Sequence, residues 1–163
     1  MEKDKKDSLD ELKKNYSKLE KKYSLPGFDE LNKDFAIERI SDEKTLFLIR
    51  EIRKFMAEKF SEYLRFIEGL LNPVNAPMFI FSVVKLLNAN DKEKLSEAYK
   101  KLSFVGINLI ELDLEFNEDK EAEFIKKGFN EWQKIKKDIL KIIEEVKKNW
   151  NKKSEVNGKS YFG

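Results

Sequence analysis

The sequence predicts an all-α protein, a compact bundle of five to six helices with a central buried helical hairpin. Three observations favour this fold. Apolar residues recur at three- and four-residue intervals along most of the 163 positions. Charged residues make up 39% of the chain, with Lys+Arg 33 against Asp+Glu 31, which is typical of solvated helix faces that carry ion pairs. Thirteen Phe residues supply large side chains for an aromatic core.

The N-terminal part is predicted to hold three helices, over residues 8–23, 29–37 and 41–71. Ser8 and Glu11 form a capping-box pattern at the start of the first helix. The Ser-Leu-Pro-Gly segment that follows it predicts a turn. The third helix, opened by Ser41, is apolar over a wide arc, which is expected of a helix that packs on more than one side.

The middle of the chain predicts two further helices. Two prolines and two asparagines in residues 72–77 end the long helix, because this segment cannot continue it. Residues 78–87 are apolar nearly all round, so we expect them to form the most buried helix and to pair with 41–71 as the central hairpin. Asn90 or Asp91 caps the next helix, which runs to Phe116.

An alternative fold is α+β, with a small βαβ insertion around residues 78–116. Residues 110–116 alternate strictly between apolar and acidic, which is a strand pattern, and residues 78–84 have a strand-like composition. We favour helices, because two strands without further partners make a poor sheet.

The last predicted helix covers about 119–150. Its buried face is marked by four large residues spaced seven apart, Ile125, Trp132, Ile139 and Val146. The periodicity then ends. The chain is therefore predicted to be a single helical domain over 1–153 with a flexible C-terminal tail over 154–163.

The absence of Cys and His narrows the chemistry of the chain. It excludes disulfides, zinc sites built from Cys and His, and nucleophilic triads that use His. We expect no cofactor. The charged N-terminus has no apolar segment of a signal peptide, and the longest apolar run is too short for a membrane span, so a cytoplasmic location is expected. The Lys- and Glu-rich composition suggests a possible thermophile.

A row of lysines on the last helix raises the hypothesis of RNA binding. Lys127, Lys134, Lys141 and Lys148 recur every seven residues. A second row, Glu131, Asp138 and Glu145, recurs at the same interval beside them. Because phosphate would compete with these acids, we interpret the helix as a solvated face and expect any RNA binding to be weak. The sequence carries no DNA-binding signal.

The acidic stretch 111–123 offers weak candidates for a magnesium site. Glu111, Glu115 and Glu118 would share one helix face, and carboxylates with substrate phosphates are typical Mg²⁺ ligands. No second acidic motif has a matching spacing, and acidic residues are common at the start of a helix. We therefore predict no metal site here.

The use of Arg is more informative, since only four of the 33 basic residues are Arg. Arg50 and Arg53 fall in rows of the long helix that are otherwise apolar, so both are predicted to be partly buried and paired with carboxylates, with Asp113 the first choice of partner. Arg65 falls on the side of the long helix that is expected to face solvent. We interpret Arg50 and Arg53 as members of structural ion pairs that fix the register of the helices. The alternative is that they bind a carboxylate or phosphate group of a ligand.

Together these features predict a non-enzymatic helical interaction or scaffold protein that binds protein partners or self-associates. Candidate binding residues are the Arg50, Arg53 and Asp113 cluster and, in the 72–77 loop, Asn72 and Asn75. An RNA- or ribosome-associated protein that uses Lys-rich terminal helices is the alternative. A Mg²⁺-dependent, carboxylate-based hydrolase of nucleotides or phosphate esters is the third possibility.

Overall fold

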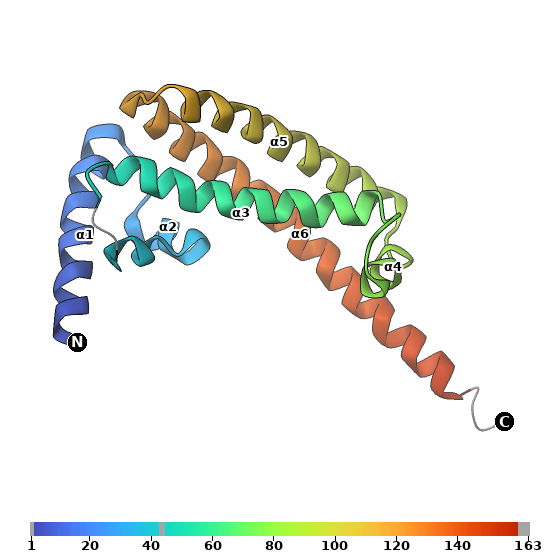
Figure 1. Ribbon diagram of the computed structural model, residues 1–163. Helices are drawn as coiled ribbons and strands as arrows, with labels where there is room; N and C mark the ends of the chain where they lie inside the picture. The colour runs from blue at the N-terminus through green and yellow to red at the C-terminus, as the bar shows by residue number, and fades with distance from the viewer. Residues whose placement is uncertain (1, 43–44, 160–163) are drawn as a thin grey trace. The chain divides into compact units, whose positions relative to one another are not determined.

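The computed structural model describes the backbone of residues 2–42 and 45–159, and the side chains of 7–42 and 45–152. Within these ranges all regular structure is helical (Figure 1). The elements in chain order are α1 (Glu2–Tyr23), α2 (Phe28–Phe35), the 3₁₀ helix η1 (Ile37–Asp42), α3 (Leu48–Leu71), α4 (Met78–Val84), α5 (Ala89–Leu114) and α6 (Glu118–Lys159). The all-α prediction is confirmed, and the α+β alternative is not needed.

The helices form two compact units. The first comprises the chain up to Glu62 together with Phe104–Glu131, and the second comprises Tyr63–Ser103 together with the chain from Trp132 onward. The sequence predicts a flexible tail over 154–163. Helix α6 continues through Lys159, and residues 160–163 lie outside the described part of the chain.

Two predicted helix starts differ from the structure. Ser8 lies inside α1, and its hydroxyl donates to the carbonyl oxygen of Ser41 instead of capping the helix. Ser41 itself belongs to η1, so it does not open α3. Just before α3 begins at Leu48, Oγ1 of Thr45 accepts a hydrogen bond of 3.1 Å from the backbone N–H of Phe47. A hydroxyl in this role satisfies one of the free donors at a helix start.

The core of the first unit is built from apolar side chains of α1, α2, η1, α3, α5 and α6. Phe60 contacts Phe35 and Phe124 edge-on, with ring centroids 5.6 and 6.3 Å apart. A Cβ at Gly128 would lie 3.2 Å from the Phe60 ring, so glycine at this position lets α6 approach α3 closely. The hydroxyl of the fully buried Tyr16 donates to the Pro26 carbonyl, and burial raises the pKa of Tyr16.

The core of the second unit centres on Trp132 of α6. Its ring packs edge-on against Tyr63 of α3, with centroids 4.9 Å apart. Ile67 and Leu95 are also buried there. The cap of α5 is a correction to the sequence prediction: Asn88 is the cap, and its side chain and that of Asp91 each accept the other's backbone N–H, at 2.9 and 3.1 Å.

Helix α4 is not the most buried element, so this part of the predicted central hairpin is wrong. Met78 is 80% exposed and Phe79 is 64% exposed, while Val83 is the buried residue of this helix. An apolar composition on all sides leads to burial only where neighbours cover all sides. A seven-residue helix directly after a proline-rich loop has too few neighbours for that.

Candidate functional site

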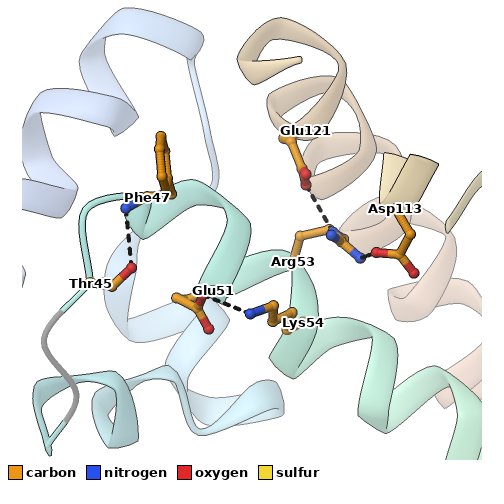
Figure 2. A network of polar contacts seen from close by, with 7 residues as sticks. All are labelled: Thr45, Phe47, Glu51, Arg53, Lys54, Asp113 and Glu121. Atoms are coloured by element: carbon orange, nitrogen blue, oxygen red, sulfur yellow. Dashed lines mark hydrogen bonds and ion pairs between the residues drawn. The ribbon is translucent and has the colours of Figure 1, made fainter. Parts of the chain in front are cut away.

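A buried arginine connects three helices of the first unit. Arg53 of α3 donates from Nε to Glu121 Oε2 of α6 at 2.9 Å and from Nη1 to Asp113 Oδ1 of α5 at 2.7 Å (Figure 2). Arg53 and Glu121 are buried, whereas the Asp113 side chain is largely exposed. The predicted ion pair of Arg53 and Asp113 is therefore present, and α3 is fixed against α5 and α6 by charge-assisted hydrogen bonds.

The buried part of this network is only partly satisfied. Within the described residues, Arg53 Nη2 and Glu121 Oε1 are buried and have no hydrogen-bond partner. Burial raises the pKa of Glu121 above its usual value of 4.5, and the hydrogen bond and charge of Arg53 oppose this shift. A buried pair with free polar atoms makes a poor contribution to stability, but removing one member leaves an uncompensated charge.

The raised pKa of Glu121 gives a testable dependence of stability on pH. The folded state holds a proton that the unfolded state releases near pH 4.5, so the contribution of Glu121 to stability falls as pH rises from there through the folded-state pKa. Glu121→Gln cannot ionise. Urea denaturation from about pH 4 to pH 7 gives the free energy of unfolding of the wild type and of this variant. We expect the difference, wild type minus variant, to decrease as the pH rises. A difference that increases with pH would contradict the assignment.

Among the described side chains, Arg50 pairs with no carboxylate, but Glu43 lies outside the described residues, so the predicted pairing of Arg50 is not tested. Its guanidinium is half-buried and lies over the ring of Phe116, 5.4 Å from the centroid. Within the side chains that the structure describes, Arg50 makes no ion pair. Its positive charge nevertheless opposes the burial-driven rise in the pKa of Glu121. An aromatic face can accommodate a guanidinium without a carboxylate. Arg65 is exposed, as predicted.

The structure does not bring the acidic candidates together. Glu111 pairs with Lys120 at 2.8 Å. Glu118 accepts hydrogen bonds from the Tyr23 hydroxyl at 2.8 Å and from Lys22 at 3.0 Å, and these two partners lower the pKa of Glu118. Glu115 is exposed just beyond the end of α5. In the described part of the chain, no group of three or more acidic residues is placed to hold a metal ion.

The predicted lysine row of α6 is exposed to solvent: Lys127, Lys134, Lys141 and Lys148. Lys148 pairs with Glu145 at 2.8 Å, and Lys127 pairs with Glu123, so acids do accompany the lysine row. Asn72 and Asn75 are both exposed in the loop between α3 and α4.

An unpredicted apolar surface lies on α5 in the first unit. Four large side chains are well exposed there: Phe104 (63%), Ile107 (63%), Ile110 (62%) and Leu114 (84%). At about 100° per residue they share one side of the helix, opposite to Leu109 and Leu112, which point toward the core. We call these four residues the α5 apolar face. The three- and four-residue spacing of these side chains is visible in the sequence, but the spacing alone does not say which side of a helix stays exposed.

A second apolar surface in the first unit is an open groove of about 790 Å³. Its apolar lining includes Leu12, Leu19, Leu46, Phe47 and Phe116, and the rings of Phe47 and Phe116 stack edge-on at 5.1 Å. Glu11, Lys18, Asp42 and Glu118 also line it, so charges of both signs surround the groove and do not select a ligand.

The chain matches no protein-family model, no curated protein and no solved structure. Among the described residues, no helix combines the length and the apolar character needed to cross a bilayer.

Proposed function

We propose that this chain is a non-enzymatic helical interaction module and that the α5 apolar face is its docking surface. This proposal is supported by four large apolar side chains that are exposed on one side of α5: Phe104, Ile107, Ile110 and Leu114. Single exposed apolar residues are ordinary on protein surfaces, but a contiguous patch of several hundred Å² is typical of an interaction site.

The pattern on α5 supports docking rather than incomplete packing. The helix already buries Leu112 in the interior of its own unit, and Leu109 beside it is half-buried, so its second apolar side is not needed for folding. Burying a large apolar side chain is worth about 1.5–3 kcal/mol, and a helical stripe with this spacing is one that a partner helix or groove can cover.

Site-specific photo-crosslinking in cells tests this proposal. We expect a photoreactive amino acid at Ile107 to give a defined crosslinked product. The matched control is the same amino acid at Asn130, an exposed position of α6 in the same unit, which should give none. Equal labelling from both positions, or no product from Ile107, would contradict a docking role for the α5 apolar face.

A further inference from the structure

We infer that the second unit binds the surface of an anionic lipid bilayer through exposed apolar side chains of the 72–77 loop and α4. These side chains are Val74, Met78 and Phe79, and we call them the α4 tip. The surface is separate from the α5 apolar face of the first unit, so the inference goes beyond the proposed function. Three features carry it: the exposure of the α4 tip, the lack of charge along its segment, and the positive charge of the second unit.

The apolar side chains of the α4 tip face solvent. Met78 is 80% exposed, Val74 is 75% exposed and Phe79 is 64% exposed. Val74 lies in a turn before α4, and Met78 and Phe79 are the first two residues of α4. The ring of Phe79 is tilted against that of Trp150 of α6, with centroids 6.5 Å apart, and Trp150 is itself 42% exposed. Large apolar side chains grouped in this way are typical of an interaction surface.

The segment that carries the α4 tip has no charged side chain. Residues 69–84 contain no Lys, Arg, Asp or Glu, although charged residues make up 39% of the chain. The polar side chains of this range are Asn72, Asn75 and Ser82. The Ser82 hydroxyl donates to the carbonyl oxygen of Met78 at 3.1 Å. A charged side chain is costly to move into hydrocarbon, so the α4 tip can enter a bilayer interface without that cost.

The second unit is strongly basic, although the whole chain is nearly neutral. Its two segments, Tyr63–Ser103 and Trp132–Gly163, contain 15 Lys and Arg against 8 Asp and Glu, which is a net charge of +7. The first unit contains 18 Lys and Arg against 23 Asp and Glu, which is a net charge of −5. Anionic lipid attracts basic side chains that come within a Debye length, about 8 Å at physiological ionic strength. The charge of the second unit therefore selects anionic over neutral lipid.

Two lysines near the α4 tip are available to anionic headgroups. Lys85 follows α4 directly, and Lys147 lies about one turn before Trp150 on α6. Both are exposed, and neither makes an ion pair with a side chain that the structure describes. A lysine can keep its ammonium group among headgroups while its aliphatic chain covers apolar surface. A tryptophan close to such lysines is typical of a membrane interface.

Single-stranded RNA is another anionic partner for a basic unit with exposed aromatic rings. Its bases stack on aromatic side chains, and Phe79 and Trp150 offer two rings. Val74 and Met78 have no ring, so stacking leaves these exposed apolar side chains uncovered. A bilayer interface covers apolar side chains of any shape. The α4 tip therefore favours lipid, and RNA binding is an outcome of the test.

Co-sedimentation of the full chain with lipid vesicles tests the inference. We expect binding to vesicles of phosphatidylcholine with about 30% phosphatidylserine, and about tenfold weaker binding to phosphatidylcholine alone. Raising NaCl from about 0.1 M to about 0.5 M should weaken binding to the anionic vesicles about fivefold. A wild type that does not sediment with anionic vesicles at about 1 mM lipid, or that binds both kinds of vesicle equally, would overturn the inference.

A carboxylate in the α4 tip tests whether this surface enters the interface. Met78→Glu should weaken binding to the anionic vesicles about tenfold, because the new charge is costly to insert and meets anionic headgroups. Leu140→Glu is the matched control: Leu140 is an exposed apolar residue of α6 in the same unit but outside the α4 tip, and the change in net charge is the same. It should bind within about threefold of the wild type.

Both substitutions are at exposed positions, so circular dichroism should show the helix content of the wild type for each variant. Equal losses of binding from Met78→Glu and Leu140→Glu would show that net charge alone drives binding. That result would overturn the α4 tip as the binding surface.

The fluorescence of Trp150 reports insertion directly. The chain has two tryptophans, and Trp132 is 3% exposed. Addition of anionic vesicles should shift the emission of the wild type to shorter wavelength, because Trp150 moves from water into the interface. Trp150→Phe should still bind, without the shift. Binding of the wild type without a shift would overturn insertion, and a shift with polyuridylic acid from a chain that does not sediment with anionic vesicles would overturn the inference in favour of RNA.

Discussion

Arg53→Met is expected to lower the free energy of unfolding by about 3–5 kcal/mol. The substitution keeps most of the side-chain volume but removes both hydrogen bonds, at 2.9 Å to Glu121 and 2.7 Å to Asp113. Glu121 is fully buried, so its carboxylate would lose its ion pair with Arg53 in an apolar surrounding. Urea denaturation at pH 7 measures the loss, and the loss should be smaller near pH 4, where Glu121 can be protonated.

Two further variants make this prediction sharper. Arg65→Met changes an exposed arginine of the same helix and should alter stability by less than about 0.5 kcal/mol. The double variant Arg53→Met with Glu121→Leu removes both buried charges and should be more stable than Arg53→Met alone. If Arg53→Met costs no more than Arg65→Met, the buried network does not stabilise the first unit.

Trp132→Ala is expected to lower the free energy of unfolding by about 3–5 kcal/mol. Trp132 is 3% exposed and packs edge-on against Tyr63 in the core of the second unit. Removing the indole loses its apolar burial and leaves a cavity that neighbouring side chains fill only in part. The loss is a large share of the roughly 5–15 kcal/mol that stabilises a typical domain, so thermal unfolding should shift visibly as well.

Trp150→Ala is the matched control for Trp132. Trp150 lies on the same helix but is 42% exposed, and its ring is tilted against that of Phe79, with centroids 6.5 Å apart. Its substitution should cost about 1 kcal/mol or less. Equal losses from the two tryptophans would show that Trp132 is not the centre of this core.

The arginine network shows where sequence reasoning reaches its limit. The pairing of Arg53 with Asp113 could be predicted, because a guanidinium in an apolar row must find an acceptor. Glu121 was not identified, since it stands among several acids at a helix start and only the packing of α6 against α3 buries it. Arg50 also falls in an otherwise apolar row, and among the described side chains it lies over the ring of Phe116.

Helices α4 and α5 show the same limit for apolar residues. The composition of α4 predicted the deepest burial, and the structure leaves Met78 and Phe79 exposed. In α5 the residues at 104, 107, 110 and 114 carry a clear helical period, yet the period alone does not say whether that side faces the core or solvent. Burial depends on which neighbours the rest of the chain supplies.

The sequence by itself determined the all-α class, the break after α3, the buried spacing of α6 from Ile125 to Val146, and the limits on chemistry without Cys and His. These features are local, since they follow from side-chain periodicity, from proline and from residue chemistry. Only the tertiary structure decided which acid reaches Arg53, where α3 begins, and which apolar side of α5 stays exposed. Those outcomes depend on contacts between segments far apart in the chain, and local pattern does not encode them.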